Sequence, residues 1–197
     1  MATRSGYNII NQYGLYFVTF TIVGWVDVFT RKACKTIMVE ALQYCVEHKG
    51  LCLHAYVIME SHVHLVLSAA ANSAGLSAII RDLKKHTSNE IVKWVRDSGR
   101  ESRKKWMLMV FKYYAKFNTR NSVYQVWKQD NQPKELLHPE FTLQKIRYIH
   151  DNPVVAKIVD QPADYLHSSA RNYLSRHDVL LEVAVIDFGI QEGYVLV

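Results

Sequence analysis

Two histidines separated by one residue are the side chains of this sequence best suited to chemistry. His62 and His64 follow the polar pair Glu60 and Ser61 and lead into an apolar run. On a strand, side chains at i and i+2 point to the same face, about 6–7 Å apart along the backbone, so both imidazoles can converge on one ion. Two nitrogens leave room for a third protein ligand to a divalent metal. The alternative is that both histidines are polar residues on an exposed strand face.

The residues around the histidine pair resemble a known motif. The run Tyr56-Val-Ile-Met-Glu-Ser-His-Val-His-Leu-Val-Leu67 resembles the strand, turn and strand of the HUH single-tyrosine transposases, especially the REP-associated and Bacteroidetes-type members. The family usually has Met-Pro-Asn before its His-Val-His, so Glu60 and Ser61 replace proline and asparagine in the turn. Both histidines remain, and the resemblance therefore implies a metal site built on His62 and His64.

A second match supplies a nucleophile. The run Lys145-Ile-Arg-Tyr-Ile-His-Asp-Asn-Pro-Val154 resembles the family's helix with the catalytic tyrosine, which gives Tyr148 that role. Outside the motif, one of the chain's 12 tyrosines would more commonly be a core or rim aromatic. Weaker matches at residues 126–129 and 162–171 extend the resemblance over residues 16–173.

Asn152 is the third metal ligand that the resemblance implies. Tyr148 and Asn152 are four residues apart, so on a helix they share one face. His150 is a weaker candidate for this ligand, because a side chain two residues after Tyr148 points to another face of the helix. The alternative role for Asn152 is to satisfy backbone groups at the helix end before Pro153.

The resemblance implies a metal-dependent transposase or endonuclease for single-stranded DNA. The metal polarises the scissile phosphate and the Tyr148 oxygen attacks phosphorus, leaving a 5′-phosphotyrosine and a free 3′-hydroxyl. Mixed nitrogen and oxygen ligation suits Mg²⁺ or Mn²⁺ as the cofactor, and the sequence does not choose between them. Two alternatives stay open: a domesticated nickase acting on chromosomal repeat palindromes, and a nucleic-acid binding module without catalysis.

The elements that must position these residues begin with a strand in residues 14–28, where β-branched and aromatic residues dominate. Apolar spacing predicts a helix over residues 30–48, ended by Lys49 and Gly50. Two apolar runs, 51–59 and 63–67, predict a hairpin whose second strand opens with the histidines. A longer helix follows from Ser73 to near Gly99.

The second half of the chain contains the predicted nucleophile helix. Residues 101–118 suit a helix or an aromatic and basic loop, and residues 124–127 suit a short strand before the turn residues 129–134. A helix over residues 141–151 should end at Asn152, since the residue before a proline disfavours helical backbone.

This order of elements predicts an α+β fold. We expect a ferredoxin-like antiparallel sheet with helices on its faces, the HUH motif on a central strand and the nucleophilic tyrosine on a later helix. Residues 1–175 would form one HUH domain, and residues 176–197 a C-terminal extension whose role the sequence does not reveal.

The basic residues cluster in one stretch. The formal net charge is +6 and the pI is about 9.2, and many Lys and Arg residues lie between Arg81 and Arg120. Such a surface can face phosphates, although a solvated helical face is an equal alternative on charge alone. We expect the partner to be single-stranded or hairpin DNA, contacted by Arg81, Lys84, Lys85, Lys104 and Lys105.

Cysteine use and hydropathy indicate the compartment. The three cysteines, Cys34, Cys45 and Cys52, are odd in number and form no CxxC pair, which argues against a disulfide framework and favours the cytoplasm. The sequence has neither a signal-peptide pattern nor an apolar run of about 20 residues, so we expect no membrane partner. The resemblance leaves open whether the protein acts as a monomer or as a homodimer that exchanges the tyrosine helix.

Overall fold

An antiparallel sheet of four strands lies at the centre of the computed structural model, which describes residues 8–117 and 123–189. The strands are ordered β2-β3-β1-β4 and comprise β1 (Tyr16–Thr21), β2 (Leu51–Ile58), β3 (His62–Ala69) and β4 (Lys134–Glu135). The predicted hairpin is present, and the histidine pair opens a central strand. The expected α+β fold with an antiparallel sheet is confirmed.

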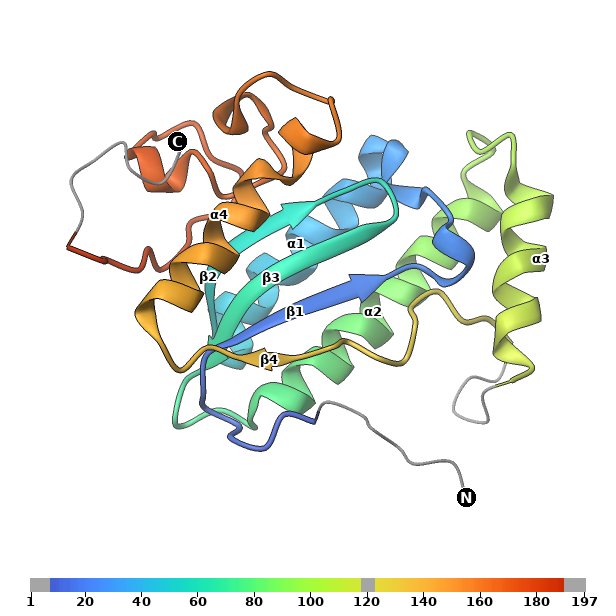
Figure 1. Ribbon diagram of the computed structural model, residues 1–197. Helices are drawn as coiled ribbons and strands as arrows, with labels where there is room; N and C mark the ends of the chain where they lie inside the picture. The colour runs from blue at the N-terminus through green and yellow to red at the C-terminus, as the bar shows by residue number, and fades with distance from the viewer. Residues whose placement is uncertain (1–7, 118–122, 190–197) are drawn as a thin grey trace.

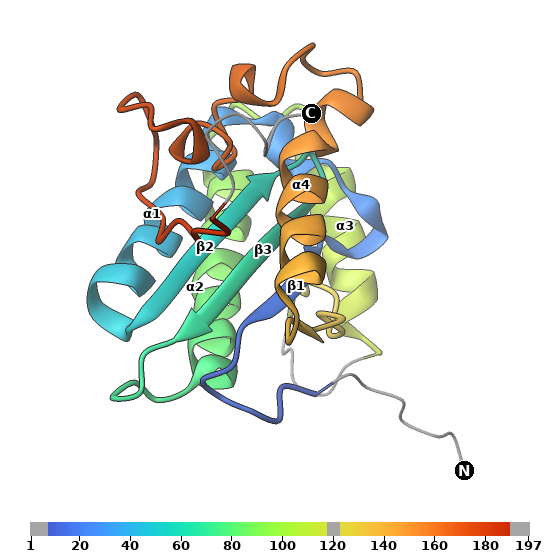
Figure 2. The same cartoon turned by 60° about the vertical axis from the view of Figure 1, so that its left-hand side comes forward.

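Within the described residues, four α-helices pack around this sheet. They are α1 (Lys32–Lys49), α2 (Leu76–Asp97), α3 (Lys104–Ala115) and α4 (Pro139–Val155). Helices α1 and α2 cover one face, α4 crosses the other, and α3 stands beyond the end of β1 (Figures 1 and 2). Short 3₁₀ turns complete the fold: η1 (Val23–Trp25), η2 (Val28–Thr30), η3 (Pro162–Asp164) and η4 (Asn172–Leu174). The segment expected to be either a helix or a loop is therefore helical over α3.

The strands divide their side chains between two cores. On the face toward α1 and α2, alternate residues of β1 and β3 are buried in the larger cluster, among them Val18, Phe20, Val63 and Leu65. On the opposite face, a smaller cluster joins the sheet to Ile146 and Ile149 of α4, together with Phe17, Ala55, Val57 and Val66. The period of two along each strand places His62 and His64 on the α4 face.

The short strand predicted over residues 124–127 is wrong. Only Trp127 makes a bridge, to Ile22, although this segment follows the edge of β1 through separate backbone hydrogen bonds such as Val23 N to Val126 O (2.8 Å) and Lys128 N to Thr21 O (2.8 Å). A continuous ladder would need every second residue to bond in register, and Pro133 further along has no N–H to donate. The regular pairing resumes only at β4.

Helix α4, which was predicted to carry the nucleophile, is longer than its sequence pattern predicts. It begins at Pro139, where proline suits the first turn, and runs through Pro153 to Val155 instead of ending at Asn152. Pro153 lies in the last turn, so it removes a single hydrogen bond to the carbonyl four residues earlier. The turn is then closed by Ala156 N to Asn152 O at 3.0 Å and Ile158 N to Pro153 O at 2.9 Å.

The described part of the C-terminal extension packs along β2, the edge strand opposite β4. Ala184 N donates to Leu53 O (2.8 Å), and His54 Nδ1 lies 2.9 Å from Ala184 O. Leu181 is buried in the larger core. These contacts cover an exposed strand edge, a position that otherwise invites pairing with other chains. Residues 190–197 of the extension, and Arg120 of the basic stretch, lie outside the described residues.

Candidate active site

The two histidine rings lie side by side at the start of β3. Their centroids are 4.8 Å apart, and the antiparallel register places Thr19 opposite His64 and Thr21 opposite His62. The Thr19 hydroxyl is 2.9 Å from His64 Nδ1. A partner on Nδ1 orients the ring and leaves Nε2 facing outward, as in imidazoles that bind metals.

Backbone contacts hold the turn before the histidines. Ile22 N donates to Ser61 O at 2.9 Å, and Phe29 N donates to Glu60 O at 3.0 Å. Met59 N also donates to His62 O at 2.9 Å across the turn. These bonds use only main-chain carbonyls, so the replacement of the family's proline and asparagine by Glu60 and Ser61 leaves the turn closed.

Tyr148 extends from α4 toward the histidine pair. Its hydroxyl lies 3.5 Å from His64 Nε2, too long for a strong hydrogen bond, and the two ring centroids are 5.1 Å apart. Phe17 contacts both rings, stacking on His64 at 5.4 Å and meeting Tyr148 edge-on at 6.0 Å. The Tyr148 side chain is nevertheless 47% exposed. The phenol is thus oriented by packing and open to a ligand from solvent.

Asn152 joins the same cluster from the next turn of α4. Burial lowers the pKa of the His62 imidazole, and the neighbouring Asn152 side chain opposes this shift only in part. Burial, followed by the charges of His62 and Lys145, lowers the pKa of His64 to about 3. Both rings are therefore neutral near pH 7, the state in which imidazole can ligate a cation.

The side chains next to the two histidines fit a divalent metal only if the Asn152 amide is one of the ligands. In the part of the chain that the structure describes, no three His, Cys, Asp or Glu side chains come together as a metal site. Two imidazole nitrogens with one amide oxygen match the mixed ligation that Mn²⁺ and Mg²⁺ accept, with water or phosphate oxygens completing the sphere. His62, His64 and Asn152 are the residues that would hold such an ion.

His150, the rival ligand, faces away from this cluster. It is fully buried, its Nε2 lies 2.9 Å from Ser169 Oγ, and its ring meets Tyr173 at 5.0 Å. Burial lowers the pKa of His150 to about 3. His150 therefore helps to pack α4 against the C-terminal segment.

Three further side chains at the site were not singled out from the sequence. Thr19 is recognisable only once β1 and β3 are paired. Lys145, one helical turn before Tyr148, places its ammonium 5.7 Å from that ring and 5.4 Å from Phe17; its i to i+3 spacing was the available signal. Trp25 of η1 approaches His62 with 5.9 Å between ring centroids.

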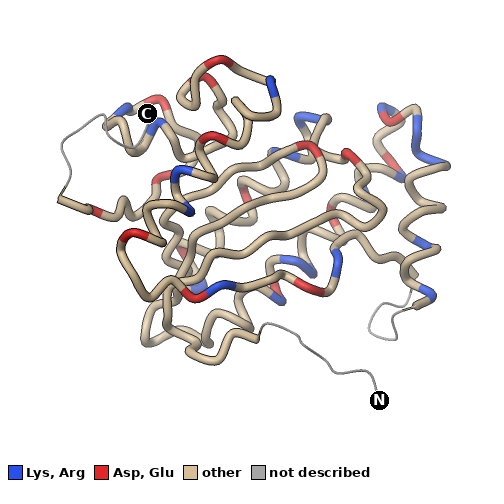
Figure 3. Tube along the Cα trace, viewed as in Figure 1, with Lys and Arg blue, Asp and Glu red and all other residues tan. Residues whose placement is uncertain are grey.

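The five basic residues expected at DNA lie in two different layers. Arg81 and Lys85 are exposed on α2, across the sheet from Tyr148, and Arg81 pairs with Asp82 at 2.9 Å. Lys84 is largely enclosed, because its ammonium donates to Lys128 O at 2.7 Å and contacts Asn131 Oδ1; burial lowers its pKa to about 8. The other two, Lys104 and Lys105, begin α3 at the end of the sheet where the histidines lie (Figure 3).

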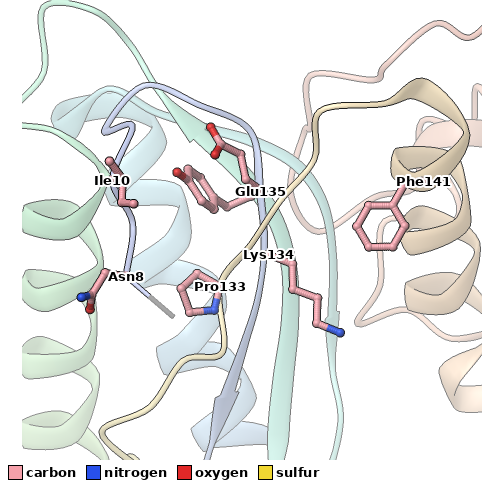
Figure 4. Close-up of a pocket in the computed structure, with 7 residues that line it drawn as sticks. Asn8, Ile10, Pro133, Lys134, Glu135 and Phe141 are labelled. Atoms are coloured by element: carbon pink, nitrogen blue, oxygen red, sulfur yellow. The ribbon is translucent and has the colours of Figure 1, made fainter. Parts of the chain in front are cut away.

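A separate hollow of about 390 Å³ opens beside β4, away from the histidines. Ile10, Pro133 and Phe141 provide its apolar lining, and Lys134 and Glu135 line it from β4 (Figure 4). It lies near the start of β1, because Tyr16 pairs with Glu135, whereas Thr19 and the histidines lie toward the other end. The hollow therefore contributes no group to the Tyr148 cluster.

Comparison with known proteins finds one matching family model and solved structures with a similar fold. A family model described as IS200-like transposase matches residues 16–128, a range that includes both histidines and ends before Tyr148. A solved REP-associated tyrosine transposase bound to a REP hairpin covers 95% of each chain with a TM-score of 0.56 at 15% identity. This likeness shows a shared fold.

A second solved structure is less similar. It is a Deinococcus radiodurans protein assigned as a transposase, which covers 77% of this chain and 97% of its own with a TM-score of 0.43 at 14% identity. That likeness is too weak to carry an argument. No curated protein matches the chain, and no helix within residues 8–117 and 123–189 is long and apolar enough to cross a membrane.

Proposed function

Since the chain belongs to the family of IS200-like transposases, we propose that it cleaves and rejoins single-stranded DNA with Tyr148 as the nucleophile and a divalent metal as cofactor. The observation that carries the proposal is the approach of the Tyr148 hydroxyl to within 3.5 Å of His64 Nε2. These residues are 84 positions apart in sequence and meet on the face of the sheet that α4 covers, where Tyr148 is half exposed. An exposed phenol beside two neutral imidazoles is suited to attack on a phosphate.

The chain's own residues divide the work of the reaction. The Tyr148 oxygen loses its proton and forms a bond to phosphorus, while the bond from phosphorus to the 3′ oxygen breaks and that oxygen gains a proton. The products are a 5′-phosphotyrosine and a free 3′-hydroxyl, and the reverse step rejoins strands. His62, His64 and Asn152 would hold Mg²⁺ or Mn²⁺, which supplies positive charge to the phosphate when bound. Thr19 and Phe17 keep the His64 ring in place.

The DNA partner would be a single strand next to a folded hairpin. The REP-associated relative is bound to a REP hairpin, and the positive net charge of this chain favours phosphate contacts. Lys104 and Lys105 are the best-placed candidates, because α3 stands at the histidine end of the sheet. Arg81 and Lys85 would contact only DNA that reaches the far layer, and the Lys84 ammonium is already occupied by carbonyl oxygens.

A single chain can supply all the proposed groups. Tyr148 faces the histidines of its own chain, which supports cleavage in cis. A homodimer remains a separate prediction, tested by sedimentation at several protein concentrations. The domesticated nickase uses the same chemistry and is distinguished by whether palindromic repeats or transposon ends flank the gene. We further propose that residues 1–175 form the catalytic unit and that the extension protects the edge of β2.

A selection for covalent adducts tests the proposal. The protein is incubated with Mn²⁺ or Mg²⁺ and a pool of single-stranded oligonucleotides with randomised centres, and DNA that stays attached to protein in SDS is recovered and sequenced. We expect adducts on a narrow set of sequences, with the modified peptide containing Tyr148. EDTA should abolish them, because the metal would no longer supply charge at the phosphate.

Variants decide which residues carry the reaction. Tyr148→Phe should form no adduct, while Tyr44→Phe, a matched change on the exposed surface of α1, should react like the parent. His62→Ala and His64→Ala should lose the adduct and keep the thermal unfolding transition. Adduct formation by Tyr148→Phe at the parental rate would overturn the proposal. DNA binding without any adduct would instead favour the non-catalytic binding module.

A further inference from the structure

Trp25 is an exposed tryptophan held in an unusual backbone conformation next to the histidines. It is 59% exposed, and its φ of 55° lies in the left-handed region, which a bulky side chain rarely adopts. The preceding Gly24 also has a positive φ, of 62°. Such strained conformations cluster at sites where function requires them. The η1 turn therefore presents an indole to solvent at an energetic cost.

Two neighbours relate this indole to the active site. The Trp25 ring meets the His62 ring edge-on at 5.9 Å, so one indole face lies within a nucleotide's reach of the Tyr148 cluster. The Lys128 ammonium lies 4.7 Å from the Trp25 ring centroid. A cation held over the ring of an exposed aromatic side chain matches a nucleotide, which has a flat base and a negative phosphate.

The turn also continues into the aromatic surface of α3. A Cβ on Gly24 would lie 3.0 Å from Val110 Cγ1 and 3.3 Å from Tyr114 Cε2, so η1 packs directly on that helix (Figure 1). Beyond it, Tyr113 is exposed and stacks edge-on with Phe117 at 5.1 Å. From residue 104 to residue 117 the chain has four lysines and no acidic residue. Aromatic rings interleaved with cations favour a nucleic-acid strand over an apolar partner.

We propose that Trp25 is the stacking platform for a base next to the scissile phosphate, and that the strand continues from it over Tyr113 and Phe117 of α3. Lys128 contacts a phosphate beside the stacked base. The proposal rests on the proposed function, because it places the substrate strand relative to Tyr148. It assigns the strained η1 turn a role in substrate binding that is separate from the metal ligands and the nucleophile.

The test combines a change in the protein with a change in the DNA. The probe is a strand recovered from the adduct selection, carrying a single abasic tetrahydrofuran residue at successive positions around the cleavage point, and binding is measured on the uncleaving Tyr148→Phe background. Trp25→Ala should weaken binding of the intact strand by about 5- to 150-fold, the range of base stacking on an aromatic ring. At one position, the abasic residue should weaken binding by the same factor when the protein has Trp25. It should not weaken binding further to Trp25→Ala, because both changes remove the same contact.

Controls separate stacking from folding. Trp25→Gly should bind as weakly as Trp25→Ala. Its unfolding temperature should equal or exceed that of Trp25→Ala, since glycine adopts a positive φ without strain. Trp25→Phe should recover part of the affinity, and Tyr44→Ala, which removes an exposed aromatic ring from α1, should change nothing. A strand with 5-iodouracil at the position identified should photocrosslink to the peptide that contains Trp25, and positions further along should crosslink to residues 113–117.

The possible outcomes distinguish the stacking role of Trp25, the strand path over α3 and the proposed function. If the parent protein forms the Tyr148 adduct but no abasic position couples to Trp25, the stacking platform is overturned and the proposed function stands. If the parent neither binds nor cleaves any strand, both are overturned. If changes to Tyr113 and Phe117 alter the protein's oligomeric mass and leave strand affinity unchanged, α3 contacts a second copy of the chain and the path over it is overturned.

Discussion

The two faces of the sheet use the same strands for different purposes. Toward α1 and α2, β1 and β3 contribute Val18, Phe20, Val63 and Leu65 to a continuous apolar core. Toward α4, the alternate residues of β1 and β3 include Thr19, His62 and His64, and the side of α4 that carries Tyr148 is half open to solvent. Neighbouring residues of one strand thus serve the fold and, in the proposed function, the chemistry.

This division explains how a reactive surface can be positioned rigidly. A histidine on β3 is bonded into a central strand with partners on both sides, while the residues before and after it are fixed by close packing. Backbone position is therefore set by the apolar face, and the polar face can be chosen for its chemistry. The proposed site needs little stabilising energy of its own.

The largest effects are expected when two adjacent residues of β3 are replaced by alanine in separate variants. His64→Ala should reduce adduct formation by more than about 100-fold, because it removes a proposed ligand of the metal that would stabilise charge at the phosphate, with little change in the free energy of unfolding. Leu65→Ala should instead destabilise the fold by about 2–5 kcal/mol, because a fully buried side chain leaves a cavity. Adduct rates and urea denaturation measure the two effects. Equal losses of stability in both variants would contradict the division between the faces.

The end of the sheet that carries Trp25 is held by charge, unlike the apolar core. Glu101 accepts hydrogen bonds from Arg31 Nε (2.8 Å) and Arg103 N (2.9 Å), and Arg103 also pairs with Asp27 at 2.6 Å. The hydrogen bond from Arg31, followed by those from Arg103, lowers the pKa of the buried Glu101 carboxyl to about 2. Its contribution to stability is full above the unfolded pKa, near 4.5, and is lost as the pH falls through the folded pKa.

Glu101→Gln should therefore lower the free energy of unfolding at pH 7 by about 2–3 kcal/mol. The difference between variant and parent should shrink as the pH falls from about 4.5 toward 2. Chemical denaturation across this pH range measures it. A constant difference at all pH values would mean that the variant acts through packing and not through the carboxylate charge.

A smaller effect is expected from the residue behind His64. Thr19→Val keeps the shape of the side chain but removes the hydroxyl 2.9 Å from His64 Nδ1, so the ring is less well oriented. Adduct formation should fall by about 10- to 100-fold, as for other partners of metal-ligating histidines. Thr19→Ser, which retains the hydroxyl, should keep most of the activity. Unchanged rates in Thr19→Val would show that the strand packing alone orients His64.

The smallest effects should come from surface cations. Replacing Lys104 and Lys105 by Gln should weaken binding of the selected strand by roughly 3- to 10-fold and reduce its salt dependence by about one counterion. Replacing Arg81 and Lys85 should change affinity less, because α2 lies on the far side of the sheet. Titrations at several salt concentrations compare the pairs. A larger loss for the α2 pair would place the DNA on the opposite layer.

The sequence by itself was enough to predict most of the helices and strands and to place the histidine pair at the start of a strand. Period-two and helical patterns over β1, β2, β3, α1 and α2 are local properties of backbone and side-chain geometry, and the hairpin follows from two apolar runs around a short polar turn. The strand predicted over residues 124–127 does not form, and the end predicted at Asn152 is three residues early. There, isolated hydrogen bonds and a proline in a last turn override propensity.

The tertiary structure alone decided what surrounds the histidines. Thr19 lies opposite His64 because of the strand register, and Tyr148 faces its own His64 because α4 crosses that face of the sheet. Lys84 is enclosed although its sequence neighbours Arg81 and Lys85 are exposed. Spacing along a chain fixes which side chains share a face of one element, whereas contacts between elements depend on how the apolar faces pack together.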